Sequence, residues 1–188
     1  DGHVATLTVT FGANEALCTT SETTTLRVTL GYPSCPFTVQ TLDTNPGWTI
    51  ANAGTGGWQY GVPTVVGPTA GHTGSNVYGT NLSGNYGGSG DFRLTTTPFD
   101  LRGLRASELR FWRWLKNEPG YDIATVEASI NGGASWTEIW KGFHWGEGWQ
   151  EERVDLSSFA DQADDVRFRF KLTSDVGTEQ PGFYVDDV

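Results

Sequence analysis

The chain has 188 residues, of which 37% are hydrophobic, and its 22 acidic and 12 basic residues give a formal net charge of −10. This length suffices for one substantial core, and the charge disfavours nucleic acid and anionic membranes as partners while it favours cations. No run of eighteen apolar residues occurs and the segment after Asp1 is polar, so we expect neither a membrane insertion nor a signal peptide.

The composition favours strands over helices. The chain contains 25 glycines, 8 tryptophans and many threonines, and it has few stretches of good helix formers. Such a composition is typical of short strands joined by tight turns. We therefore expect an all-β fold.

The first strands are expected near the N-terminus. Residues 4–11 and 23–30 alternate between apolar and polar side chains, which is the period of half-buried strands. Because two strands alone are marginally stable, residues 1–36 are expected to be either the terminal strands of a preceding domain or an N-terminal extension. The turn-rich segment 31–36 indicates a boundary, which leaves residues 37–188 as a second domain.

The two cysteines, Cys18 and Cys35, lie on either side of the second of these strands. A disulfide between them is predicted; it would stabilise the chain by about 3 kcal/mol in the chain-entropy account and would indicate an oxidising compartment. Two unpaired buried thiols are the alternative, because two cysteines make a weak pattern.

Nine further strand candidates follow. They are residues 37–42, 76–82, 91–99, 107–116, 122–130, 136–143, 150–156, 165–172 and 182–188. The pair Asn131-Gly132, between the fifth and sixth candidates, is typical of a β-hairpin. Nine short strands separated by glycine-rich turns indicate a two-sheet sandwich.

The segment 165–172 combines an apolar face with a cationic one. Alternation places its apolar side chains together, and Arg167, Arg169 and Lys171 on the opposite face. The apolar face is expected in the core. On an acidic protein the cationic face indicates either carboxylates of the same chain, simple solvation, or a ligand.

The segment 107–116 carries two tryptophans, Trp112 and Trp114, on its polar face. Exposed flat aromatic rings bury the C–H faces of sugars, so these residues are candidate ligand-binding side chains. The other candidates are Arg167 and Arg169 and the loop aromatics Trp58, Tyr60, Trp145 and Trp149. In the alternative interpretation, loops cover this face of the sheet and the tryptophans are structural.

Seven motifs occur in order between residues 37 and 188, among them "LDTNPGWT", "GGWQYGVPT", "LRFWRWLKNEPGYDIATVEASINGGASWTEIW" and "PGFYVDDV". Together they resemble a bacterial MAM-like jelly-roll module, of the kind appended to secreted subtilisin-like and immune-inhibitor-A-type proteases. The resemblance implies a two-sheet antiparallel jelly-roll sandwich of the concanavalin type in a secreted or cell-surface protein. Residues 1–36 resemble the closing strands of an immunoglobulin-like domain.

The glycine-rich stretch 71–86 has the spacing of a phosphate loop but lacks its Lys-Ser/Thr pair. In modules of the type it resembles, this stretch is structural, because its glycines allow tight turns before a strand.

The resemblance also implies a structural calcium ion between the first and last strands. The positions carried over are Asp43 and either Asp186 or Asp187, with Asp122 as a further candidate. Carboxylates are ligands that calcium prefers, and adjacent residues of a strand point to opposite faces, so only one of the last two is expected at the site. Without a cation these carboxylates would cap turns or pair with arginines.

We expect no catalysis. The three histidines lack the spacing of zinc ligands, and no nucleophile elbow occurs. Two carboxylate pairs, Glu118 with Asp122 and Glu151 with Glu152, would suit a glycoside hydrolase only if they flanked a glycosidic bond. The expected function is therefore either binding of a glycan or protein partner, or a structural spacer beside other domains of a parent chain; the exposure of the aromatic residues discriminates between them.

Overall fold

The computed structural model describes residues 38–143 and 148–188, together with the two strands at 5–10 and 23–28. The chain forms two compact units, Asp1–Thr38 and Val39–Val188. In the first unit β1 (Ala5–Thr10) pairs antiparallel with β2 (Thr23–Val28). Both predicted strands are thus confirmed, whereas Cys18 and Cys35 lie outside the described residues and their disulfide stays a prediction.

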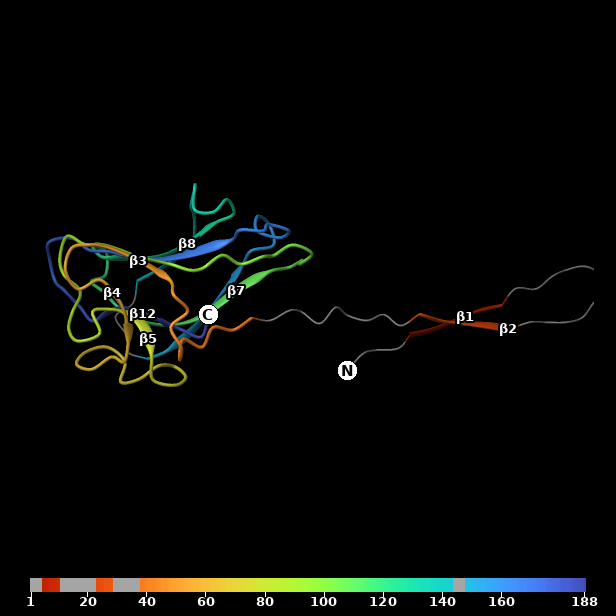
Figure 1. Ribbon diagram of the computed structural model, residues 1–188, viewed down its shortest axis with the longest axis horizontal. Coiled ribbons are helices and arrows are strands. Elements are labelled where there is room, and N and C mark those ends of the chain that lie inside the picture. Colours follow the sequence, from red (N-terminus) through yellow and green to blue (C-terminus); the bar gives the residue numbers. More distant parts are fainter. Residues whose placement is uncertain (1–4, 11–22, 29–37, 144–147) are drawn as a thin grey trace, which may run out of the picture. The chain divides into compact units, whose positions relative to one another are not determined.

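The second unit is a β-sandwich, which confirms the predicted fold class. Its strands are β3 (Thr49–Ala53), β4 (Trp58–Gly61), β5 (Val77–Thr80), β6 (Asp91–Thr95), β7 (Glu108–Lys116), β8 (Ile123–Ser129), β9 (Thr137–Gly142), β10 (Gln150–Asp155), β11 (Arg167–Thr173) and β12 (Gly182–Asp186). They form two antiparallel sheets, with the orders β10-β7-β12-β5-β4 and β3-β6-β11-β8-β9. Figure 1 shows β3 and β8 in one layer and β4, β5 and β12 in the other.

Eight of the nine strands predicted for this unit are present, but the one at 37–42 is wrong. Residues 38–42 form no regular strand. Gln40 nevertheless exchanges two backbone hydrogen bonds with Val188, at 2.7 and 3.1 Å, so the beginning of the second unit lies beside residue 188. The sequence analysis missed β3 and β4. All five residues of β3 are exposed, and β4 has only four residues, so neither shows the alternation on which the prediction depends.

The core lies between the sheets and is rich in aromatic rings. Phe170 of β11 meets Phe111 and Phe183 of the opposite sheet, with ring centroids 5.3 and 6.1 Å apart. The alternation predicted for β11 is confirmed, because Phe168, Phe170 and Leu172 are buried. The strands β8 and β9 form the predicted hairpin, although their loop spans residues 130–136 rather than a two-residue turn.

Residues 62–76, which we call the cover loop, connect β4 to β5 and lie on the outer face of the first sheet. Gly67 packs against the ring of Tyr184, and a Cβ atom there would stand 2.5 Å from that ring. Farther along, the backbone N–H of Thr73 donates to Asp186 Oδ2 at 3.1 Å. The cover loop therefore shields β12 from solvent and positions the site described next.

Candidate binding cleft and acidic sites

Aromatic side chains line the outer face of the first sheet. We call Trp112, Trp114, Tyr184 and Trp149 the aromatic row. Along β7, Phe111 and Leu115 enter the core, so Trp112 and Trp114 emerge on the outer face. In the β7–β12 register Trp114 lies opposite Tyr184, and their rings meet edge to face at 5.5 Å. Trp149 immediately precedes β10, the neighbouring strand, and packs with these residues.

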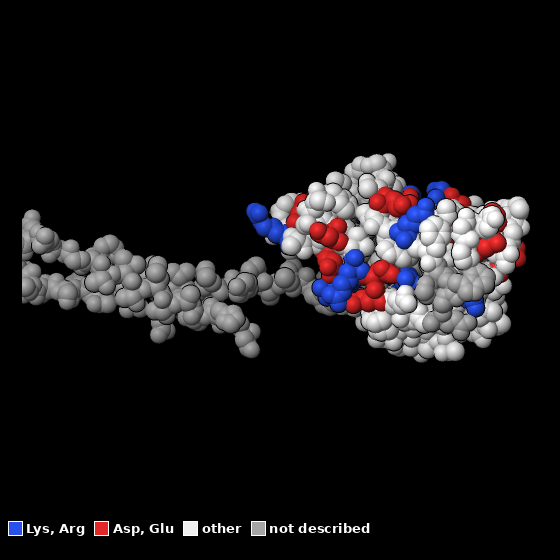
Figure 2. All heavy atoms as spheres, turned by 180° about the vertical axis from the view of Figure 1, so that it is seen from behind, with Lys and Arg blue, Asp and Glu red and all other residues white. Residues whose placement is uncertain are grey.

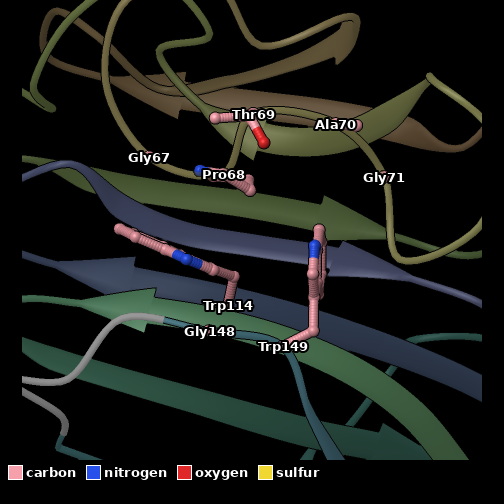
Figure 3. A pocket seen from close by; sticks show the side chains of 8 residues that line it. All are labelled: Gly67, Pro68, Thr69, Ala70, Gly71, Trp114, Gly148 and Trp149. Atoms are coloured by element: carbon pink, nitrogen blue, oxygen red, sulfur yellow. The ribbon is translucent and has the colours of Figure 1, made fainter.

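A cleft of about 310 Å³ separates the aromatic row from the cover loop. It is lined by Gly67, Pro68, Thr69, Ala70, Gly71, Trp114, Gly148 and Trp149. Figure 3 shows Pro68 and Thr69 facing the two indoles, with the ring of Trp149 reaching toward the loop and that of Trp114 lying along its strand. Trp149 is half-buried, whereas Trp114 retains only 5% of its exposed area. Trp149 is therefore the indole that offers a ring face to a ligand.

His72, from the cover loop, contacts both Trp112 and Trp149. Its ring stacks on Trp112 with centroids 3.6 Å apart, and it meets Trp149 edge to face at 6.4 Å. Nδ1 of His72 lies 2.6 Å from Oδ2 of Asp187. The stack and the Asp187 contact orient the imidazole, which restricts the ring of Trp149 on the side where the two rings meet.

Sequence reasoning missed Pro68, Thr69 and His72 as parts of this site. They come close to Trp112 and Trp149 only through the tertiary fold, and no local pattern marks such a contact. The available signal was the length of the cover loop, because long segments without regular structure inside a compact domain are uncommon and often functional.

The remaining aromatic candidates differ in accessibility. Trp58 is 1% exposed, and its indole N–H donates to the Phe92 carbonyl in the core at 3.2 Å. Its prediction as a ligand-binding residue is therefore corrected: inward alternation on β4 makes it structural. Tyr60 is half-buried and donates to the Leu42 carbonyl at 2.6 Å, and Trp145 lies outside the described residues.

The cationic face of β11 pairs with carboxylates of the same chain. Arg169 lies 2.5 Å from Glu127 and stacks over Trp136 at 4.1 Å. Arg167 lies 2.8 Å from Asp165, and the pKa of that carboxyl is lowered by its hydrogen bond from Arg167. On the face seen in Figure 2, basic and acidic side chains likewise lie next to one another. Internal pairing, one of the predicted alternatives, accounts for these arginines.

The predicted calcium ligands gather around the end of the cover loop. A Cβ atom on Gly74 would overlap the carboxylate of Asp43, and one on Gly71 would stand 2.8 Å from Asp186 Oδ2 and 3.3 Å from the Asn76 carbonyl oxygen. Asp43 thus lies beside Gly74, and Asp186 lies beside Gly71 together with the main-chain carbonyls of Thr73 and Asn76. Such hard oxygen donors fit a calcium ion.

Asp187 departs from the expected alternation. Its φ of 45° lies in the left-handed region, because β12 ends at Asp186. Its Oδ1 accepts from the Thr73 hydroxyl at 2.7 Å, while Asp186 accepts from the backbone N–H of the same threonine. Both aspartates therefore contact the cover loop through Thr73, and the expectation that only one of them faces a calcium ion stays a prediction.

Asp186 is fully buried, and no lysine or arginine among the described residues pairs with it. Burial raises its pKa to about 6, and the neighbouring charge of Asp187 contributes to the rise, whereas hydrogen bonds from backbone N–H groups oppose it. The pKa of Tyr60 is raised by burial and then by the charges of Asp43 and Asp186. Both carboxylates therefore raise the pKa of the same phenol.

Asp122 does not join this group. Asp122 follows the C-terminal end of β7, where Lys116 pairs with Gly182 at the start of β12. Asp186 lies at the other end of β12. The oxygens of Asp122 come within 4.8 Å of those of Glu118 and Asp175, an arrangement able to hold a metal ion. The same carboxylate accepts hydrogen bonds from the Tyr86 hydroxyl and, at 2.9 Å, from the Asp175 backbone N–H.

The two carboxylate pairs considered for catalysis have partners within the chain. Glu152 lies 2.7 Å from the buried Arg113, and Glu151 lies 2.7 Å from Arg153. Asp122 is 1% exposed, which leaves a substrate no access to it.

In sequence, the chain is similar to a short part of one larger protein. No protein-family model matches it. It is 32% identical over 163 residues to Bacillopeptidase F of Bacillus subtilis (strain 168), and the match covers 86% of this chain but only 11% of that protein.

Solved structures with the same fold are adhesin and carbohydrate-binding domains. The K1 cleaved adhesin domain of Lys-gingipain from Porphyromonas gingivalis W83 is 17% identical, with a TM-score of 0.56 over 80% of this chain and 94% of that one. A structure of carbohydrate-binding modules from the β-sandwich superfamily is 14% identical, with a TM-score of 0.54 over 99% of this chain and 73% of that one. At such identities the likeness concerns the fold. Within the described residues no helix is long and apolar enough to cross a membrane.

Proposed function

We propose that residues 39–188 form a non-catalytic accessory module of a larger extracellular protein, and that the module binds a glycan in the cleft between the cover loop and the aromatic row. The observation that carries this proposal is the half-buried indole of Trp149, which borders a cleft of about 310 Å³ and is in edge contact with His72. Sugar rings stack on such preorganised aromatic faces.

The comparisons support this proposal without establishing it. The fold is shared with domains whose names state carbohydrate binding and adhesion, and the sequence is related to a small part of a peptidase. A module of a protease that recognises a glycan near the substrate would agree with both. The finer assignment to a MAM-like jelly-roll module, and a secreted or cell-surface location, belong to the same proposal.

The proposal excludes catalysis by this unit on the basis of its carboxylates. Glu151 and Glu152 are held by arginines, and Asp122 is enclosed by hydrogen bonds. A purely structural spacer is favoured by the burial of Trp58 and Trp114. The position of the half-buried Trp149 in the lining of the cleft favours binding instead.

We further propose that a structural calcium ion binds at the end of the cover loop. Asp43 and Asp186 would supply carboxylates, and the carbonyl of Asn76 would supply a neutral oxygen. The ion would neutralise the buried charge of Asp186 and tie the cover loop to β12. In this way it would stabilise one wall of the cleft.

The test is isothermal titration calorimetry of the full chain against a panel of methyl glycosides of neutral hexoses and N-acetylhexosamines. We expect one or more of these sugars to bind, and Trp149→Ala to weaken that binding at least about tenfold. Trp136→Ala is the matched control, because Trp136 is also half-buried but lies in the loop between β8 and β9, away from the cleft lining. Binding that is equally reduced by both substitutions, or the absence of binding, would favour the structural spacer.

A further inference from the structure

We infer that the cleft recognises the uncharged end of a glycan rather than an internal stretch of a long polymer. This inference rests on the proposed function and concerns the class of ligand that the same site accepts. It follows from the closed borders of the cleft, from its lining and from its size.

The cleft is blocked across the strands on the β12 side. Gly67 lies directly on the ring of Tyr184, next to Trp114, and a Cβ atom at this position would stand 2.5 Å from that ring. No sugar can pass between the cover loop and β12 at this point. A chain lying across the strands therefore has to end inside the cleft.

The cleft is also blocked along the strands on the side of Trp112. There the ring of His72 stacks on Trp112 at 3.6 Å, and Asp187 holds the imidazole at 2.6 Å. This stack stands directly behind Trp149, with which His72 is in contact. The cleft is otherwise open, and a long straight polymer would meet the Gly67–Tyr184 contact along one axis and the His72–Trp112 stack along the other.

The lining indicates a ligand without charge. Among the residues that the structure describes, the eight that border the cleft have no ionisable side chain. Thr69 supplies a hydroxyl, the loop glycines leave backbone polar groups accessible, and the indoles supply stacking surfaces. A carboxylate or sulfate of an acidic sugar would find no cationic partner among these residues, and the net charge of −10 would repel it.

The size agrees with a short ligand. A volume of about 310 Å³ lies at the lower end of the range for ligand pockets, about 300–1,000 Å³. One or two sugar rings therefore fit, with the first ring stacked on Trp149 and its hydroxyl groups within reach of Thr69.

The experiment uses the neutral sugar that binds best in the methyl glycoside panel. Its linear oligosaccharides of two to six units are titrated into the full chain by calorimetry, together with the same oligosaccharides capped at the non-reducing end and with the matching glucuronide or other uronic acid glycoside. We expect affinity to change by less than about threefold from two to six units, and the cap and the carboxylate each to weaken binding at least about tenfold.

Three outcomes separate the claims. Affinity that rises more than about tenfold with chain length, or that is unaffected by the cap, would overturn recognition of a chain end while it leaves glycan binding intact. Equal binding of the uronic acid glycoside would overturn the uncharged class. Binding that is indifferent to Trp149→Ala, or binding of a proline-rich peptide and of no sugar, would overturn the proposed function together with this inference.

The variant Thr69→Val adds a test within the cleft. It removes the hydroxyl but preserves the shape of an exposed side chain, so it leaves the fold intact. We expect it to weaken the sugar about threefold to tenfold. No effect would mean that the first ring does not lie beside Thr69.

Discussion

Asp186→Asn tests the electrostatics of the buried carboxylate. Asp186 is fully buried and its pKa is raised to about 6 from an ordinary value of 3.8, chiefly by burial. A carboxyl group with a raised pKa contributes stability while it is protonated, and this contribution is lost as the pH rises through the folded value of about 6. In the absence of a cation, ionised Asp186 therefore destabilises the module at neutral pH.

The magnitude follows from the shift. The difference between the two pKa values corresponds to about 3 kcal/mol in total, of which about 2 kcal/mol falls between roughly pH 4.5 and roughly pH 7.5. Asparagine carries no charge and removes this pH dependence. Its amide N–H₂ would face the Thr73 N–H, which now donates to Oδ2, so Asp186→Asn also costs about 1–3 kcal/mol at every pH.

The measurement is the free energy of unfolding in urea, with chelator present, at several pH values. We expect the difference between the original chain and Asp186→Asn to change by about 2 kcal/mol over this range, in favour of the variant as the pH rises. Asp43→Asn is the control, because it removes a carboxylate that is exposed rather than buried. A constant difference between Asp186→Asn and the original chain would refute the assignment of the raised pKa to Asp186.

Three further predictions concern the cation, the cover loop and the tryptophans. Calcium at about one hundred times its dissociation constant should stabilise the module by about 2.7 kcal/mol, which raises the unfolding midpoint by roughly 5–10 °C relative to a thermal scan with chelator. Asp43→Ala should abolish this rise. An unchanged midpoint in the original chain would contradict the proposed calcium site. Gly67→Ala and Gly103→Ala both place alanine at a positive φ, but only the alanine at position 67 meets Tyr184. Urea unfolding should therefore show Gly67→Ala to be less stable than Gly103→Ala by about 1–3 kcal/mol. Equal stability of the two variants would contradict the close packing of the cover loop. Trp58→Ala should cost about 3–5 kcal/mol because Trp58 lies in the core, whereas Trp149→Ala should cost under about 1 kcal/mol, and comparable losses in urea unfolding would show that Trp149 is structural as well.

The features predicted from sequence are those that depend on local alternation. In β11 the period of two separates Phe168 and Phe170 from Arg167 and Arg169, and the structure places the first pair in the core and the second on the surface. The same rule placed Trp112 and Trp114 on the outer face of β7. It could not tell how deeply each would be covered, because that depends on the cover loop.

The features that sequence could not predict depend on contacts distant along the chain. His72 and Trp112 are forty residues apart, and their stack exists because β5, β12 and β7 are neighbours in one sheet. Likewise the pairing of Arg169 with Glu127 requires the register of β11 with β8. The position of Asp187 depends on its left-handed φ, which no residue type at that site specifies.

The paired backbone hydrogen bonds between Gln40 and Val188 join two segments that are far apart along the chain. Residues that exchange both bonds in an antiparallel pair have Cα atoms about 5.5 Å apart. This separation is also the usual Cα distance across a disulfide. A disulfide engineered between these two positions would therefore close a loop that contains nearly the whole sandwich, and loops of such length give the largest expected entropic stabilisation.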